Sequence, residues 1–545
     1  MNSSLMSAAR PKLETGADTF SSVRRHQLSD IVRRSALRFP DRMAICCGET
    51  RWSYSEFDRL VSRLAAALRQ EGLGAGDRVG ILARNSHAFA LWRFAVARIN
   101  AVFVPINFML KADEVAYILS HAKVLALACD LEHAELALAA QVQAPVLKHV
   151  FGLPSEDSQQ TPKGMKSLEQ LLGQVGSGYD PVEREIDAKN GIDVDQPQTL
   201  AQIVYTSGTE SLPKGAMLSH GAILSQYVSC VIDAEVRAED KLLHALPLYH
   251  CAQLDVFFGP SIYVAAQNII AARPVPSQLI ALIEQHQINS FFAPPTVWIG
   301  MLRDPGFSPQ RLGSLRKAYY GASIMPVEVL KELTSRLPQV RFWNLYGQTE
   351  IAPLATMLQP EDQWRKAGSC GKPVLHVETR VVDDDMRDVV PGEVGEIVHR
   401  SPHLMQGYLD DPEKTAMAFR GGWFHSGDLA IIDEEGYMTV VDRKKDMIKT
   451  GGENVASREV EEMIYRLGEV SEVAVVGLPD PKWVEAVTAF VVIKTGHQLV
   501  EQAIIEHCHR HLAGFKCPKR VIFVESLPKN PSGKILKRQL RDQSL

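Results

Sequence analysis

The densest group of side chains suited to phosphate is Tyr205 to Gly215, which reads Tyr-Thr-Ser-Gly-Thr-Glu-Ser-Leu-Pro-Lys-Gly after the apolar pair Ile203-Val204. Hydroxyls and loop N–H groups donate hydrogen bonds to phosphate oxygens, and a lysine adds positive charge. The segment is not a P-loop, because Pro213 stands where that motif needs glycine and Lys214 is followed by glycine. It predicts a phosphate loop, with a flexible surface turn as the alternative.

A second candidate is Asn344-Leu345-Tyr346-Gly347-Gln348-Thr349-Glu350, which follows the strand-like stretch 340–343. A tyrosine can stack on a purine base, a threonine can reach a phosphate, and a glutamate can ligate Mg²⁺ through oxygen. In isolation, a turn with a capping threonine explains the segment equally well.

Three further segments lie toward the C-terminus. Residues 422–429 contain Asp428, whose carboxylate could accept two ribose hydroxyls. Residues 442–454 combine a charged run with Gly451-Gly452-Glu453, and residues 528–535 present Lys534 on a Gly-Ser loop. A lysine held in this way can meet developing negative charge, whereas solvated surface charge is the plainer interpretation of either segment alone.

In this order and spacing the five segments resemble the motifs of the adenylate-forming superfamily, which includes acyl-CoA synthetases, peptide-synthetase adenylation domains and luciferases. The sequence looks most like fatty acid–CoA ligases, from about Leu28 to the C-terminus. Family members convert a carboxylic acid and ATP to acyl-AMP and pyrophosphate. A small domain then rotates about a hinge, and a thiol takes the acyl group.

The resemblance implies ATP, Mg²⁺ and coenzyme A as co-substrate, and it assigns roles by position. The implied catalytic residues are Thr206, His250, Glu350, Lys449 and Lys534, with Glu350 also binding the metal and Lys445 at the hinge. The implied nucleotide and cofactor contacts are Thr206, Ser207, Gly208, Thr209, Lys214, Gly321, Ala322, Ser323, Tyr346, Gly347, Thr349, Asp428, Arg443, Gly451, Gly452 and Glu453. The implied substrate pocket comprises Tyr249, His250, Leu254, Phe257, Trp298 and Tyr320.

The apolar residues after His250 favour a medium- to long-chain fatty acid, because apolar pockets suit apolar tails. Leu254 replaces a gating tryptophan of similar long-chain enzymes, so aryl and short branched acids stay open. The chain ends 11 residues after Lys534, which favours free coenzyme A over a fused carrier domain, although a separate carrier protein stays open. A luciferase-like oxidation and a binding module without chemistry are the weaker alternatives.

The sequence also shows alternating helix and strand patterns, and the elements they predict must position the candidate residues. Ser53 with Glu56 predicts a capping box before an amphipathic helix over 57–68, and 79–83, 242–248 and 290–293 read as strands. Helices are expected over 277–286, 327–337, 458–467 and 501–511, and strands over 378–382, 396–399, 438–441, 471–477 and 486–494. This pattern predicts layered α/β architecture with largely parallel sheets. We expect a large domain over 1–441 with a β-rich subdomain at 374–441, a hinge at 442–446, and a small α+β domain over 447–545.

The 545 residues carry 59 Lys and Arg against 64 Asp and Glu, a formal charge of −5 that argues against nucleic-acid binding. Residues 510–545 nevertheless hold nine Lys or Arg and two acids, a local balance of about +7 that suits polyanionic ligands. The eight scattered Cys favour buried, reduced thiols in a cytoplasmic protein. Residues 1–20 lack a secretory signal, and 254–272 reads as buried core rather than a membrane span. Peripheral membrane contact and a homodimer stay open.

Overall fold

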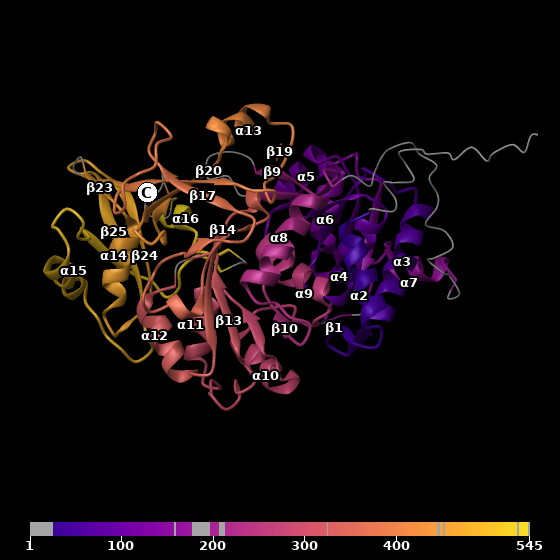
Figure 1. The fold of residues 1–545 in the computed structure, drawn as a ribbon, viewed down its shortest axis with the longest axis horizontal. Helices are drawn as coiled ribbons and strands as arrows, with labels where there is room; N and C mark the ends of the chain where they lie inside the picture. The colour runs from indigo at the N-terminus through magenta and orange to yellow at the C-terminus, as the bar shows by residue number, and fades with distance from the viewer. Residues whose placement is uncertain are drawn as a thin grey trace, which may run out of the picture.

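A computed structural model describes residues 25–156, 158, 160–176, 197–206, 213–323, 325–443, 447–450, 453–530 and 533–542. A large N-terminal α/β domain and a smaller C-terminal domain lie side by side in it, as Figure 1 shows. The predicted fold class is therefore confirmed.

Two largely parallel sheets form the centre of the large domain. The eight-stranded sheet has the order β19-β9-β8-β4-β3-β5-β6-β7, and only the pairings of β9 and β19 are antiparallel. Its strands are β3 (Arg78–Leu82), β4 (Val102–Pro105), β5 (Val124–Asp130), β6 (His149–Leu153), β7 (Lys166–Ser167), β8 (Leu200–Thr206), β9 (Lys214–Ser219) and β19 (Gly407–Tyr408).

The nine-stranded sheet has the order β16-β15-β14-β13-β12-β10-β11-β1-β2, parallel from β14 to β1 and antiparallel at both edges. Its strands are β1 (Met43–Cys47), β2 (Thr50–Ser53), β10 (Lys241–His244), β11 (Gln267–Ile270), β12 (Ser290–Phe292), β13 (Lys317–Gly321), β14 (Arg341–Gly347), β15 (Leu354–Leu358) and β16 (Lys372–Pro373). The expected strand 242–248 was too long, because the chain turns after His244 and reaches Pro247, which has no N–H to donate.

Helices cover these sheets. The predicted capping box is confirmed at the start of α3, where the Glu56 amide donates to Ser53 Oγ (3.2 Å) and the Ser53 amide donates to Glu56 Oε2 (2.7 Å). The helices of the large domain are α2 (Leu28–Arg38), α3 (Tyr54–Gln70), α4 (His87–Arg98), α5 (Ala112–His121), α6 (Ala134–Gln143), α7 (Leu168–Gln174), α8 (His220–Asp233), α9 (Gly259–Val264), α10 (Pro276–His286), α11 (Pro295–Arg303), α12 (Val327–Arg336) and α13 (Pro412–Ala418).

A four-stranded antiparallel sheet lies between the large sheets and the small domain. Its order is β17-β18-β20-β21, formed by β17 (Glu378–Val382), β18 (Val394–Arg400), β20 (Phe424–Ile432) and β21 (Met438–Arg443). β21 ends at Arg443, and the next strand belongs to a different sheet.

The small domain packs helices on a sheet in which β22, β23, β24 and β25 pair in antiparallel fashion and β26 adds a parallel edge. Its elements are β22 (Ile448–Thr450), β23 (Glu453–Val455), α14 (Ser457–Tyr465), β24 (Val470–Asp480), β25 (Val484–Ile493), α15 (Glu501–His511), β26 (Arg520–Phe523) and α16 (Lys537–Asp542).

The segment 254–272, expected to be core, forms the π-helix η3 (Ala252–Phe258), α9 and β11, and most of its side chains are buried. Within the described part of the chain, no helix is both long and apolar enough to cross a bilayer. All eight cysteines are buried and free.

Asp255 on η3 anchors a buried polar network at the centre of the large domain. It accepts hydrogen bonds from Gln202 Nε2 (2.9 Å) and Tyr227 OH (3.0 Å), and Arg93 Nη2 lies 3.7 Å from its carboxylate. The network joins β8, α8 and α4 to η3. Because both charges are removed from water, each depends on the other for compensation.

We therefore expect Asp255→Ala to lower the free energy of unfolding by about 3–5 kcal/mol, since it leaves the Arg93 charge buried without its partner. The double variant Arg93→Met, Asp255→Leu should recover part of this loss. Chemical denaturation measures both. Glu284→Ala, which breaks the surface pair with Arg311, is the matched control and should cost under about 1 kcal/mol. Equal losses from Asp255→Ala and the control would contradict the prediction.

Candidate active site

The chain segments that carry the predicted site residues meet at one edge of the nine-stranded sheet. β10, β12, β13 and β14 run parallel, so their carboxyl ends lie at the same edge, where ligands bind in open α/β sheets. Residues 247–250 follow β10, 294–296 follow β12, 321–323 end or follow β13, and 346–350 end or follow β14. Figure 1 shows β10, β13 and β14 in the same part of the large domain, and β12 pairs between β10 and β13.

Glycines at the ends of β13 and β14 allow neighbouring backbone segments to approach each other closely. A Cβ on Gly321 would lie 2.5 Å from the Leu345 carbonyl oxygen, and one on Gly347 would lie 1.8 Å from the Pro353 carbonyl oxygen. Ala322 has a φ of 62°, in the left-handed region that a residue with a side chain seldom adopts. Strained backbone of this kind clusters at ligand-binding sites.

Tyr408 links the phosphate-loop strand to the predicted metal ligand. Its hydroxyl donates to Glu350 Oε1 (2.8 Å), and Lys214 Nζ lies 4.6 Å from the centre of its ring. Burial, followed by the Glu350 charge, raises the pKa of Tyr408, so the phenol keeps its proton. The arrangement holds one cation over the face of the ring and one carboxylate at its hydroxyl.

A second tyrosine joins the nine-stranded sheet to the antiparallel sheet. Tyr346 OH donates to Asp428 Oδ2 (2.7 Å), and Arg443 Nε lies 3.4 Å from Asp428 Oδ1. Asp428 and Arg443 are register partners on β20 and β21. The predicted purine-stacking tyrosine and the two predicted ribose contacts therefore form one connected group.

Three further candidates for nucleotide contacts, Thr206, Lys214 and Thr349, lie at or just after the ends of strands. Thr206 ends β8 and pairs with Lys214 at the start of β9. Thr349 Oγ1 lies 3.4 Å from Cys251 Sγ, which connects the loop after β14 to the turn after β10. Burial raises the pKa of Cys251 to about 12. Six predicted residues lie outside the described part of the chain, namely Ser207, Gly208, Thr209, Lys445, Gly451 and Gly452.

Lys534 reaches the large domain on a tight turn. The Lys534 amide donates to Asn530 Oδ1 (2.8 Å), and the Gly533 amide donates to the Asn530 carbonyl (2.9 Å). Thr296 Oγ1 donates to the Gly533 carbonyl (3.1 Å). A Cβ on Gly533 would lie 2.5 Å from Thr296 Oγ1 and 2.6 Å from Pro294 Cγ, and the φ of Gly533 is +80°. Only glycine fits this contact, which docks the small domain on the start of α11.

His250 is held in one tautomer and is influenced by the Lys534 charge. The Ala252 amide donates to His250 Nδ1 (3.2 Å), so the neutral ring carries its proton on Nε2. Burial and the nearby Lys534 charge lower the pKa of His250 to about 4. At neutral pH the ring is therefore an uncharged hydrogen-bond donor, suited to orient a carboxylate rather than to take a proton.

The predicted substrate-pocket residues are divided among three packed clusters. Tyr249 and Leu254 belong to the cluster around α3, α4 and α8, where Tyr249 packs edge-on against Phe108 (5.1 Å between ring centres). Trp298 and Tyr320 lie on one face of the nine-stranded sheet, and Phe257 lies on the other, stacked 4.4 Å from Phe292. The role of these side chains as one acyl pocket stays a prediction.

Lys449 and Glu453 lie on the β22–β23 hairpin of the small domain, with both side chains exposed. The Lys449 amide donates to Glu485 Oε2 (2.6 Å), which ties the hairpin to β25. In this orientation it is Gly533, the neighbour of Lys534, that contacts the large domain at α11. The catalytic role of Lys449 stays a prediction.

Sequence reasoning missed two positioning residues, Tyr408 and Thr296. Neither stands in a patterned motif, and each contacts its partner from a distant part of the chain. A single sequence contains no signal that would have paired them.

Glu350 suits Mg²⁺ as a single carboxylate. Mg²⁺ in nucleotide enzymes is usually held by one or two carboxylates together with substrate phosphates and water. Among the described residues, no trio of His, Cys, Asp and Glu could hold a metal without such help. One oxygen of Glu350 is fixed by Tyr408, and the hydrogen bond leaves the carboxylate with further acceptor capacity.

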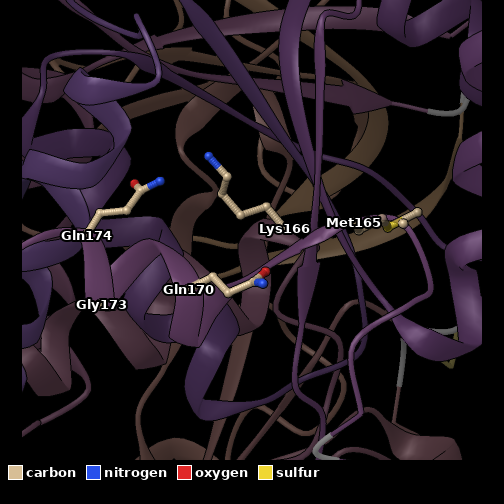
Figure 2. Close-up of a pocket in the computed structure, with 6 residues that line it drawn as sticks. Met165, Lys166, Gln170, Gly173 and Gln174 are labelled. Atoms are coloured by element: carbon tan, nitrogen blue, oxygen red, sulfur yellow. The ribbon is translucent and has the colours of Figure 1, made fainter.

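A surface hollow elsewhere does not belong to this group. Figure 2 shows it at β7 and α7, lined by Gly164, Met165, Lys166, Gln170, Gly173 and Gln174. Lys166 pairs there with Glu71 (2.5 Å), so its charge is already compensated.

The fold, a large N-terminal α/β domain with a smaller C-terminal domain, is that of adenylate-forming enzymes, and comparison with known proteins gives the family. The AMP-binding enzyme family matches residues 32–409, and the AMP-binding enzyme C-terminal domain matches residues 459–534. The chain belongs to this family. It is an AMP-forming acid–CoA ligase, with ATP, Mg²⁺ and CoA as its co-substrates.

Individual relatives differ in the acid they are named for. A feruloyl-CoA synthase of Amycolatopsis is 34% identical over 513 residues, which cover 94% of this chain and 97% of the relative. A long-chain-fatty-acid–CoA ligase of Mycobacterium tuberculosis is 34% identical over 500 residues, covering 91% and 93%. The crystal structure of an anthranilate CoA ligase with anthranoyl-AMP aligns with a TM-score of 0.86 at 25% identity, covering 96% and 98%.

The electrostatic influence of Lys534 on His250 predicts a measurable pKa change. Lys534→Met removes the positive charge, so the pKa of His250 should rise from about 4, but only part of the way to its ordinary value of 6.5, because burial is the larger cause of the shift and remains. Titration of labelled histidine by NMR, assigned with His250→Gln, measures it. Lys537→Met is the matched control, because Lys537 pairs with Glu461 inside the small domain. An unchanged His250 pKa in Lys534→Met would show that the two groups are not coupled.

Proposed function

We propose that the residues gathered at the carboxyl edge of the nine-stranded sheet carry out the adenylation of a carboxylic acid, with Lys534 as the charge-neutralising residue. The observation that carries this proposal is the docking of Gly533 on the start of α11, next in the chain to Lys534, whose charge lowers the pKa of His250. A lysine in this position can stabilise the charge that develops between the acid and the α-phosphate.

Each neighbouring group has a role in the proposal. His250 Nε2–H orients the acid carboxylate, while Thr206 and Lys214 contact the phosphates. Asp428 and Arg443 hold the ribose, and Tyr346 fixes Asp428 while facing the base. Mg²⁺ held by Glu350 would offset the phosphate charge. Thioester formation with CoA then requires the hairpin of Lys449 at the site, which we assign to a second orientation of the small domain.

For the acid, we propose a compact apolar tail, with aryl acids first. Support comes from the packing of the predicted pocket residues, since Leu254, Phe257, Trp298 and Tyr320 are all at most 2% exposed. Phe257 packs against both Phe292 and Tyr319, at 4.4 and 5.0 Å between ring centres. A flat aromatic tail needs less displacement of these rings than an extended alkyl chain does. The feruloyl- and anthranilate-activating relatives agree with this choice.

A medium- to long-chain fatty acid is the second candidate. It is favoured by the apolar character of residues 254–258 and by the 34% identity to a long-chain ligase over most of both chains. We further propose that the protein works in the cytoplasm with free CoA, as the sequence predicts; a homodimer and peripheral membrane contact stay predictions.

An acid panel discriminates between the two candidates. Protein, ATP, Mg²⁺ and CoA are incubated with hydroxycinnamic, aminobenzoic, octanoic and hexadecanoic acids, and pyrophosphate and thioester are both measured. We expect the highest kcat/KM with an aryl acid. A preference for hexadecanoic acid by tenfold or more, about 1.4 kcal/mol, would replace the first candidate with the second. Thioester from none of the acids would contradict the ligase assignment at this site.

Lys534→Ala tests the mechanism independently of the acid. We expect acid-dependent ATP–pyrophosphate exchange to fall by about a hundredfold or more, because one preorganised charge partner is removed from the transition state. ATP affinity, measured by calorimetry, should change little. Lys519→Ala is the control and should keep full exchange, because Lys519 is a half-buried lysine of the same basic segment that lies over Trp483. Unchanged exchange in Lys534→Ala would remove this lysine from the reaction.

A further inference from the structure

Helix α14 of the small domain is bound to the large domain by two charged side chains one turn apart. Arg458 Nη2 donates to the Gly368 carbonyl (2.8 Å), and Arg458 Nη1 donates to the Val440 carbonyl on β21. The Glu462 carboxylate lies close enough to the amide of Val327, the first residue of α12, for that N–H to favour its charged form. Figure 1 shows α14 next to α12.

These contacts cross the predicted hinge. Val440 precedes residues 442–446 and Arg458 follows them, so rotation about that segment must separate the two partners. Gly368 and Val327 also belong to the large domain. The partners are backbone groups whose positions are fixed by the fold, so they can be matched in only one orientation of α14.

The local environment strengthens both contacts. A Cβ on Gly368, which has a φ of +82°, would lie 2.9 Å from Arg458 Nη2, so the guanidinium fills the space a side chain would occupy. Arg458 and Glu462 attract each other along the helix, and burial lowers the pKa of Arg458 and raises that of Glu462. Hydrogen bonds to charged groups are the stronger ones, more so where water is excluded.

We propose that Arg458 and Glu462 form a latch that holds the small domain in the orientation in which Lys534 contacts the active site. This inference rests on the proposed two-step reaction. The latch residues touch no substrate, so they are positioning residues. Their removal should lower the fraction of molecules in the Lys534-docked orientation and slow adenylation, while the second half-reaction, which uses another orientation, should be spared.

The principal variants are Arg458→Met and Glu462→Ala. Each is expected to lower acid-dependent ATP–pyrophosphate exchange about tenfold, the effect of losing hydrogen bonds to a charged group. Conversion of a supplied acyl-adenylate to thioester by CoA should change less than about twofold. Glu462→Gln keeps an acceptor oxygen for the Val327 amide and should restore most of the exchange. Glu459→Gln is the matched control, because Glu459 pairs with Lys516 inside the small domain (2.7 Å).

Domain orientation is measured separately by spin labels on Glu328→Cys in α12 and Glu506→Cys in α15. Both sites are exposed and the eight native cysteines are buried, so labelling is selective. The unaltered protein should give one dominant distance, which Arg458→Met and Glu462→Ala broaden or shift and Glu459→Gln leaves in place. Equal losses in both half-reactions, with an unchanged distance distribution, would overturn the latch. Because the distances need no turnover, they test the latch even if no acid is activated and the proposed function fails.

Discussion

The contact of Gly533 with Pro294 and Thr296 is the constraint on which the site depends. A main-chain carbonyl of the small domain meets a side-chain hydroxyl of the large domain at a place where no Cβ fits. The Asn530 turn then sets the direction of the following residue. A flexible lysine side chain is thus placed by rigid backbone, which limits the entropy lost when it engages a charged substrate. The pKa of His250 is lowered mainly by burial, and the Lys534 charge that this approach brings near lowers it further.

Two tyrosine hydroxyls position further carboxylates of the site. Tyr408 fixes Glu350 from β19, and Tyr346 fixes Asp428 from β14. Each hydrogen bond connects segments of two different sheets. Together the two bonds link all three sheets of the large domain at the site. Burial raises the pKa of both phenols, which therefore stay protonated donors to carboxylates across the working pH range. Preorganised donors of this kind cost no reorganisation when ligand binds.

Local sequence patterns predicted helices and strands well where a single local signal, such as a capping box or a helical repeat of apolar residues, determined the element. The Ser53–Glu56 box placed the start of α3, and the helix expected at 501–511 is α15. The strand expected over 242–248 was too long, because apolar residues continue past the point where the parallel strand ends and the chain turns into the site. The resemblance placed Asp428, Arg443 and Tyr346 in one group, and the structure brings them together. The contacts of Tyr408, Thr296 and Arg458 could not be predicted, since each joins segments far apart in the chain and carries no spacing of its own.

Cys251 lies beside Thr349 in the site, and its thiol is buried with a pKa of about 12. At neutral pH the thiol therefore keeps its proton, whereas the thiolate is the nucleophilic form. An acyl-adenylate is an electrophile that any reactive thiol would intercept. Because the Cys251 thiol is protonated and the seven other cysteines are buried, the enzyme can hold such an intermediate without acylating itself. Burial of the cysteines therefore prevents them from competing for the activated acyl group, which stays available to the thiol of a bound co-substrate.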